Sequence, residues 1–334
     1  MKQKIFFLIS LLLFIFSIPL FTCLQKTETL NFFKNNPLVT NVNAEPQITN
    51  NTDEPYFHVF DKSSGKIISL SIKDFTYGAV ATEMPLTFEP EALKAQAVAS
   101  FTYFNNLKEK NVQHADPNLN GADFSVDSAN WLYFVSKEQM QARWGENFNF
   151  YYDKLSQAIN PVLGQSLKKD GKFIEALYHS ISSGNTESIV DVFGGNLSYL
   201  KSVPSPGDTL APGFQTLKEF SIEDFKNISK NKWPDISFPD NNLLNINKRT
   251  GSGMVLDANI GSITTSGREI RDIFSLRSAN FDVNIDSDKI VFSVKGYGHG
   301  VGMSQYGAQN MALQGATYTQ ILAWYYPDTE LSFL

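Results

Sequence analysis

The sequence is poor in side chains that bind metals or form disulfides. Among 334 residues there is one cysteine, Cys23, and there are four histidines, His58, His114, His179 and His299. A single cysteine excludes an intramolecular disulfide and a cysteine-based zinc site. The histidines form no His-Glu-x-x-His pair. We therefore expect no metal and no other cofactor.

Clusters of basic residues are also missing. The net charge is −6, the isoelectric point is about 5.3, and lysines gather in nothing larger than pairs such as Lys168-Lys169. Nucleic-acid binding needs clustered lysine and arginine, so we expect no nucleic-acid partner. Aromatic residues are plentiful, with 27 Phe and 13 Tyr. Flat rings of this kind suit sugar faces as well as hydrophobic cores.

The N-terminus predicts a membrane anchor. Lys2 and Lys4 precede an apolar run over residues 5–24, and a helix of that length spans about 30 Å, the thickness of a bilayer core. The lysines place the N-terminus in the cytoplasm and the remainder outside. The alternative is a cleaved signal peptide, but the nearest small-residue site, at residues 42–44, lies too far downstream. We expect an uncleaved anchor at residues 1–24.

Three segments follow from this interpretation. Residues 1–24 are the anchor, residues 25–55 are a flexible extracytoplasmic tether, and residues 56–334 are one catalytic domain. Asn, Thr, Gln and Pro dominate the tether, and such a composition buries too little apolar surface to offset the cost of ordering. The domain is therefore expected to begin near Tyr56.

The domain is predicted to be α+β, with helices and antiparallel hairpins around one substrate groove. Turn residues between apolar runs predict three hairpins, at 56–60 with 67–72, at 165–167 with 172–179, and at 281–285 with 290–295. Residues 254–260 are expected to form a strand. Helical spacing and capping residues predict helices that end at Glu83, begin near Pro90 and Ser266, and cover 137–145, 150–159, 222–229, 304–314 and 317–325. Residues 111–135 and the remainder of 204–245 are expected to be irregular.

Glu83 is the first candidate for chemistry. It lies in the segment Tyr77-Gly-Ala-Val-Ala-Thr-Glu83-Met-Pro85, and the apolar residues Met84, Leu86 and Phe88 follow it. An acid among apolar groups is partly desolvated, which raises its pKa. A carboxyl group that stays protonated near neutral pH can donate a proton to the leaving oxygen of a glycosidic bond. The alternative is that Glu83 caps a turn at the surface.

Two later segments carry further polar groups. One is His179-Ser-Ile-Ser-Ser-Gly-Asn-Thr-Glu187, and the other is Gly296-Tyr-Gly-His299-Gly-Val-Gly-Met-Ser304-Gln305-Tyr306-Gly307. Ordinary turns with capping hydroxyls are the alternative explanation for both. Serine hydrolysis is a rival chemistry, since Ser183 and Ser304 accompany the two histidines. However, residues 302–306 break the Gly-x-Ser-x-Gly elbow at its last position.

Together these segments resemble the stage II sporulation protein D family, whose wider membership includes enhancers of wall amidases. The resemblance rests on Glu83-Met-Pro85 with residues 91–99, on residues 179–187, and on residues 298–308, and the tail Ile321-Leu-Ala-Trp-Tyr-Tyr-Pro327 extends it. It implies a lytic transglycosylase in the cell membrane, on the mother-cell side of the engulfing septum. Such an enzyme cuts peptidoglycan glycan strands, preferably those stripped of stem peptides, and its catalytic acid maps onto Glu83.

One carboxylate is enough for this reaction, whereas hydrolysing glycosidases generally use two. The acid protonates the bridging oxygen, then takes the proton from the muramic C6 hydroxyl, which closes on C1 as a 1,6-anhydro end. The candidates for binding the substrate are Lys94, Gln96, His179, Ser183, Glu187, His299, Gln305 and Tyr306. The possible second acids are Glu89, Glu91 and Glu187.

The chain departs from the family at two places. Some members bind zinc through a histidine and two cysteines, where this chain has Ser125 and Trp131, and most carry an arginine where this chain has Phe101. The alternative function is a non-catalytic peptidoglycan-binding protein that recruits or stimulates a cell-wall amidase, and a purely structural septal protein is a third. The expected partners are glycan strands, a cell-wall amidase or endopeptidase, and a membrane scaffold of the engulfment machinery.

Overall fold

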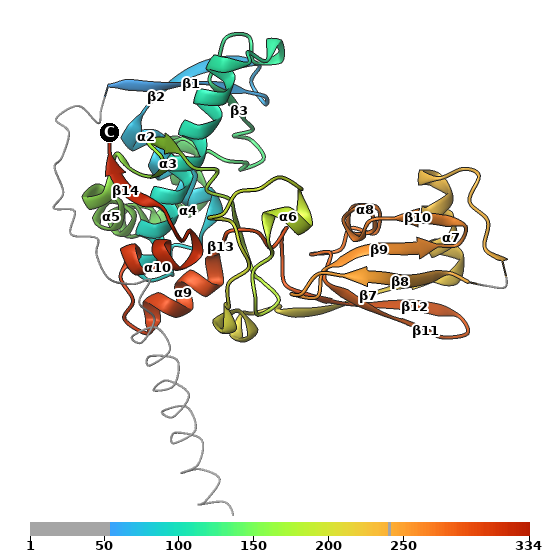
Figure 1. Cartoon of the computed structure of the whole chain (residues 1–334). Helices are drawn as coiled ribbons and strands as arrows, with labels where there is room; N and C mark the ends of the chain where they lie inside the picture. Colours follow the sequence, from blue (N-terminus) through green and yellow to red (C-terminus); the bar gives the residue numbers. More distant parts are fainter. Residues whose placement is uncertain (1–53, 240–241) are drawn as a thin grey trace, which may run out of the picture. The chain divides into compact units, whose positions relative to one another are not determined.

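The computed structural model describes residues 54–239 and 242–334, and they form the predicted mixture of helices and antiparallel sheets (Figure 1). No helix among these residues is both long enough and apolar enough to span a bilayer. The predicted anchor at residues 1–24, and residues 25–53 of the predicted tether, lie outside the described residues.

Helices and strands are interspersed along the chain. The helices of four residues or more are α2 (Ile72–Glu83), α3 (Pro90–Gln113), α4 (Lys137–Trp144), α5 (Phe148–Ile159), α6 (Ile189–Val192), α7 (Ile222–Lys232), α8 (Gly267–Ile273), α9 (Gln305–Leu313) and α10 (Tyr318–Tyr325). The strands are β1 (Pro55–Asp61), β2 (Lys66–Ser71), β3 (Phe124–Val126), β4 (Gln165–Lys169), β5 (Lys172–Phe173), β6 (Tyr178–His179), β7 (Gln215–Ser221), β8 (Leu244–Arg249), β9 (Val255–Ile260), β10 (Ile263–Thr265), β11 (Phe281–Ile285), β12 (Lys289–Lys295), β13 (Met303–Ser304) and β14 (Glu330–Phe333).

Local capping chemistry fixes the two helices on either side of the Glu83 loop. Helix α2 starts where the Ser71 side chain accepts a hydrogen bond from the Asp74 amide at 3.0 Å. It stops at Glu83 because Met84 is extended and Pro85 cannot continue the helix. Helix α3 then begins with Pro90, whose ring fits the first helical position.

A cluster of aromatic rings forms the core of the helical part. Phe57 lies 4.7 Å from Phe75 and 5.8 Å from Phe101, ring centre to ring centre, and Phe104 lies 4.6 Å from Phe124. These residues come from β1, α2, α3 and β3 and are all buried. Phe101, at the position where the resemblance implies an arginine, is therefore a core residue here.

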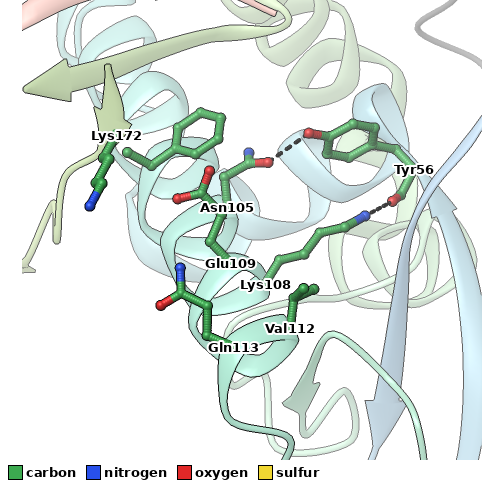
Figure 2. A pocket seen from close by; sticks show the side chains of 8 residues that line it. Tyr56, Asn105, Lys108, Glu109, Val112, Gln113 and Lys172 are labelled. Carbon is green, nitrogen blue, oxygen red and sulfur yellow. Dashed lines mark hydrogen bonds between the residues drawn. The ribbon is translucent and has the colours of Figure 1, made fainter. Parts of the chain in front are cut away.

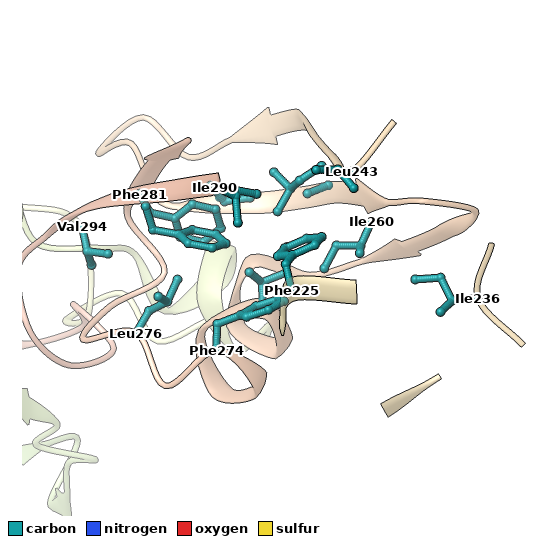
Figure 3. Close-up of a cluster of buried hydrophobic side chains, with 14 residues drawn as sticks. Phe225, Ile236, Leu243, Ile260, Phe274, Leu276, Phe281, Ile290 and Val294 are labelled. Atoms are coloured by element: carbon teal, nitrogen blue, oxygen red, sulfur yellow. The ribbon is translucent and has the colours of Figure 1, made fainter. Parts of the chain in front are cut away.

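The second core lies in the β-rich part, between two sheets. The sheet orders are β11-β12-β7 and β10-β9-β8, and both sheets are antiparallel. Helices α7 and α8 contribute Phe225 and Ile270 to the core, and the ring of Phe225 stacks 4.8 Å from that of Phe274 (Figure 3). The core also contains Phe281 and Phe292.

Several details of the predicted elements are wrong. Of the hairpin arm 172–179, only β5 pairs antiparallel with β4, because Tyr178 and His179 instead pair in parallel with β13. Residues 204–245 are not irregular, since they contain β7, which pairs with β12. The segment 111–135 contains β3, which pairs in parallel with β1. The strand β14, which pairs with β4, was not predicted.

Candidate functional site

Glu83 meets the other two motifs through a chain of hydrogen bonds. It is the last residue of α2 and is half-buried. Gln305, the first residue of α9, donates through Nε2 to Glu83 Oε2 and to Gln96 Oε1, each at 3.4 Å. Gln96 donates to Ser100 Oγ at 2.9 Å, and Ser100 Oγ lies 3.5 Å from the Tyr178 hydroxyl. Residues distant in sequence thus share one polar chain around the carboxyl.

Burial sets the protonation state of Glu83. Desolvation raises the pKa of its carboxyl to about 7, and the hydrogen bond from Gln305 acts in the opposite direction. Within the part of the chain that the structure describes, no cation and no second carboxylate shifts this pKa. The carboxyl group therefore exists in both the protonated and the ionised form near neutral pH, as a proton donor and acceptor requires.

Helix α9 also supports the loop that follows Glu83. The ring of Tyr306 packs edge-on against Phe88, with ring centres 5.0 Å apart. The Glu89 amide donates to Gln309 Oε1 at 2.6 Å. The loop therefore has contacts with α9 at Phe88 and at Glu89, in addition to the hydrogen bond between Gln305 and Glu83 itself.

His179 and His299 lie side by side as neutral rings. Their centres are 5.7 Å apart. His179 Nδ1 donates to the Val301 carbonyl at 3.1 Å, and burial, followed by the neighbouring His299, lowers its pKa to about 3. His299 Nδ1 accepts from the Val301 amide at 3.1 Å, and burial, followed by the charge of Arg271, lowers its pKa to about 4.

Tyr178 connects this histidine pair to Glu83. His299 hydrogen-bonds to the backbone of Tyr178. The Tyr178 hydroxyl is buried, and burial, followed by the charge of Glu83, raises its pKa well above the ordinary value. His179 Nε2 has no hydrogen-bond partner and is buried, so it is an acceptor available to a hydroxyl group of a ligand.

The glycines of residues 296–302 allow two segments to approach closely. Gly298 and Gly300 have φ of +108° and +82°. A Cβ added at Gly298 would lie 2.9 Å from His179 Cβ, and one added at Gly300 would lie 2.8 Å from Glu187 Cγ. Only glycine fits such positions, so the run permits His299 to lie directly beside the His179 segment.

Three predicted site residues are bound elsewhere. Lys94 forms an ion pair with Glu91 at 2.5 Å. Ser183 donates to the Ser252 carbonyl at 2.9 Å, and Thr250 Oγ1 donates to Glu187 Oε1 at 3.1 Å. These bonds connect the 179–187 segment to the turn between β8 and β9, so Ser183 and Glu187 hold this segment in place. The assignment of substrate contacts to Lys94, Ser183 and Glu187 therefore stays a prediction without geometric support.

Asp208 is a buried group that the sequence did not reveal. Ser304 Oγ donates to its Oδ1 at 2.7 Å, and the Ser182 amide donates to its Oδ2 at 3.0 Å. Burial raises its pKa, and the serine hydrogen bonds act in the opposite direction. Ser304 is thus bonded to a carboxylate and caps α9, and in the described part of the chain it forms no bond to a histidine. The arrangement gives no support to a serine hydrolase.

The pocket in Figure 2 is a separate feature. It encloses about 390 Å³ and is lined by Tyr56, Asn105, Lys108, Glu109, Val112, Gln113, Lys172 and Phe173. The Tyr56 hydroxyl donates to Asn105 Oδ1 at 2.7 Å, and Lys108 Nζ donates to the Tyr56 carbonyl at 2.6 Å. None of the predicted site residues lines this pocket.

The two positions at which the resemblance implies zinc-binding cysteines carry other side chains, Ser125 and Trp131. Trp131 packs under the guanidinium of Arg143, whose carbon lies 4.0 Å from the ring centre, and Ser125 lies in β3. In residues 54–239 and 242–334 no three His, Cys, Asp or Glu side chains are placed to bind one metal ion.

Comparison with known proteins decides the family. A family model described as stage II sporulation protein matches residues 61–168. Stage II sporulation protein D of Bacillus subtilis is 33% identical over 274 residues, which cover 82% of this chain and 78% of that protein. Its counterpart in Bacillus amyloliquefaciens is 34% identical over the same shares. The chain belongs to the stage II sporulation protein D family.

Another relative of the chain has a different name. The amidase enhancer of Bacillus subtilis is 28% identical over 307 residues, which cover 76% of this chain and 40% of that protein. The family match includes Glu83 and Gln96, whereas His179, His299 and Gln305 lie beyond residue 168. The structure adds to the family match the hydrogen bond between Gln305 and Glu83.

Proposed function

We propose that this protein is a lytic transglycosylase that cleaves peptidoglycan glycan strands during septal thinning and engulfment, and leaves 1,6-anhydro-muramic ends. The observation that supports it is a lone carboxyl group, Glu83, whose pKa is about 7 and which has no second carboxylate among the groups that shift it in the described residues. Hydrolysing glycosidases generally pair two carboxylates. A site with one acid is suited to a nucleophile that the substrate itself supplies.

The mechanism follows from the two forms of Glu83. The protonated carboxyl gives its proton to the bridging oxygen as the bond to C1 breaks. The resulting carboxylate, which accepts a hydrogen bond from Gln305 Nε2, then takes the proton of the muramic C6 hydroxyl as that oxygen bonds to C1. Because the attack is intramolecular, its effective concentration is very high. Neutral His179 and His299 orient sugar hydroxyl groups.

Fragment analysis tests the proposal. The full-length protein, held in detergent micelles, is incubated with purified peptide-free glycan strands, and the products are weighed by mass spectrometry. Anhydro ends support the transglycosylase, whereas reducing ends would show a hydrolase. Glu83→Gln should abolish cleavage and retain strand binding and folding. The matched control is Glu89→Gln, because Glu89 lies in the same loop and its side chain caps no helix.

We further propose that residues 1–24 hold the protein in the cell membrane, with the N-terminus cytoplasmic and residues 56–334 on the mother-cell side of the engulfing septum. The support is the apolar run after Lys2 and Lys4. After alkaline carbonate washing of sporulating cells, the full chain should remain in the membrane fraction. A variant without residues 5–24 that stays equally bound would refute the anchor.

The second candidate function is a non-catalytic protein that binds peptidoglycan and recruits or stimulates a cell-wall amidase. The relative named amidase enhancer supports it, and an amidase or endopeptidase together with a membrane scaffold would be its partners. In that case wild-type protein would leave purified strands intact and would raise the rate at which an added amidase removes stem peptides.

A further inference from the structure

Three of the five arginines of the chain gather around the glycine-rich segment. They are Arg268 and Arg271 on α8 and Arg277 in the loop after it, and we call them the arginine cluster. The guanidinium carbon of Arg277 lies 4.3 Å from the ring centre of Tyr297, and that of Arg268 lies 4.6 Å from the ring centre of Phe193. Both rings are nearly half exposed, at 46% and 45%.

The charge of the cluster is only partly balanced. Among the described residues, none of the three arginines forms an ion pair with a carboxylate, whereas Arg249 pairs with Asp282 at 2.8 Å. Arg268 donates to the Val192 carbonyl, and Arg277 Nε is buried without a hydrogen-bond partner. The acid that acts on Arg271 is its chain neighbour, Asp272, which is exposed.

The cluster offers hydrogen-bond donors to an anionic ligand. Burial lowers the pKa of Arg271, the charges of Asp272 and Tyr297 raise it, and the charge of Arg268 lowers it by a smaller amount. A guanidinium group has five donors arranged as a fork that matches a carboxylate. Among the donors of the three arginines, Arg277 Nε is buried without a hydrogen-bond partner. An anion bound at the cluster would accept a hydrogen bond from the guanidinium groups and offset the repulsion among the three cations.

A series of side-chain interactions links the cluster to Glu83. Phe193 packs against His299, with ring centres 5.5 Å apart, and His299 hydrogen-bonds to the backbone of Tyr178. The charge of Glu83 in turn raises the pKa of the Tyr178 hydroxyl. Phe193, His299 and Tyr178 therefore connect the cluster to Glu83.

We propose that the arginine cluster binds the lactyl carboxylate of a muramic acid residue from which the stem peptide has been removed, while Phe193 and Tyr297 contact the sugar rings. The lactyl group ends in a neutral amide when a stem peptide is attached and in a free carboxylate once the peptide is gone. A site built from unpaired arginines distinguishes these two states directly. The inference rests on the proposed function in one respect only, which is that the ligand is a peptidoglycan strand.

The test uses the full-length chain carrying Glu83→Gln, so that strands are bound and not cut. Peptide-free strands are compared with the same strands after their carboxylates have been converted to methylamides. The native strands should bind about tenfold more tightly, which corresponds to one charge-assisted hydrogen bond, and high salt should reduce the difference. Arg271→Gln and Arg268→Gln, each added to this background, should remove most of it.

The control is Arg143→Gln, because Arg143 packs on Trp131 and lies outside the cluster. This variant should keep the full preference for native strands. Arg268 is exposed, so the Arg268→Gln protein should fold even if the Arg271→Gln protein does not. Equal binding of native and amidated strands, or an unchanged preference in both cluster variants, would overturn the inference.

The cleavage assay separates this inference from the proposed function. Suppose that the wild-type protein forms anhydro ends and the Glu83→Gln protein binds native and amidated strands equally well. That result would refute the role of the cluster and leave the transglycosylase proposal in place. The opposite result is a Glu83→Gln protein that clearly prefers strands with free carboxylates and a wild-type protein that leaves strands uncut. That result would refute the transglycosylase and leave the role of the cluster in place.

Discussion

Apolar surroundings, and not neighbouring charges, give Glu83 its unusual pKa. Met84, Leu86 and Phe88 are all buried around the loop that follows it, and these neighbours were sufficient to predict the direction of the shift. Gln305 was named as a candidate, but its bond to Glu83 joins residues 222 positions apart and could not be placed from the sequence. Tyr178 and Asp208 carried no sequence signal, since a tyrosine in a strand and an aspartate in a Pro-Gly turn are common.

The activity should depend on pH through Glu83. Because the first step needs the protonated acid, kcat/KM for strand cleavage should fall about tenfold per pH unit above pH 7. The hydrogen bond from Gln305 lowers the pKa of Glu83, so Gln305→Ala should move this decline to higher pH. A decline that begins near pH 4.5, the ordinary value for glutamate, would contradict the assignment.

The stability of the folded protein should depend on the same group. Folding raises the pKa of Glu83 from 4.5 to about 7, so the folded state binds the proton more tightly than the unfolded state. The resulting stabilisation is fully present below pH 4.5 and is lost as the pH rises through 7. A rise from 4.5 to about 7 corresponds to ~3 kcal/mol.

Glu83→Gln provides the measurement, because glutamine stays neutral at every pH. The free energy of unfolding of the variant, from urea titrations, should exceed that of the wild type at pH 8 and should match it at pH 4. A variant that is less stable than the wild type at pH 8 would show that the ionised carboxylate is well stabilised in the folded state.

At the scale of elements, short-range signals predicted well and long-range pairing did not. The hairpin of β1 and β2 and that of β11 and β12 form as predicted, because turn residues and apolar runs lie next to each other in the chain. β7 was missed because it is exposed at almost every position, so it shows no apolar alternation. The parallel pair of β6 and β13 joins two-residue segments more than a hundred positions apart, and such pairs leave no local pattern.

Gly78 in α2 provides a test at this scale. Alanine normally stabilises a helix interior by about 1 kcal/mol relative to glycine. Here a Cβ would overlap the ring of Phe134 and the Val135 carbonyl, so Gly78→Ala should instead destabilise the protein by about 1–3 kcal/mol. The matched control is Gly251→Ala, where a Cβ meets no atom within 4 Å. Chemical denaturation of both variants gives the comparison.

At the scale of the whole molecule, the described residues contain two hydrophobic cores. One contains Phe57 and Phe104, the other contains Phe225 and Phe292, and they share no residue. The segments that carry His179 and His299 pair with each other through Ile181 and Tyr297. The α+β class followed from the pattern of the sequence, but the separation into two cores did not, because apolar residues occur along the entire described chain.

The two cores should respond separately to damage. Phe225→Ala removes a buried ring from the β-rich core and should cost about 3–5 kcal/mol. Hydrogen exchange followed by mass spectrometry should show lost protection in β7–β12 and unchanged protection in α3. Leu217→Ala, at a position 65% exposed on β7, is the control and should change neither. Equal loss of protection in α3 would mean that the molecule unfolds as one unit.

The alternating glycines of residues 296–302 also constrain how this gene can change. Gly296, Gly298, Gly300 and Gly302 all have positive φ, and at each of them an added Cβ would collide with a neighbouring segment. In a saturation library screened for sporulation, these four codons should therefore tolerate no missense change. The codon for Tyr297, whose side chain reaches solvent, should accept other aromatic residues. Over codons 296–302, tolerance to missense mutation should thus alternate from one codon to the next.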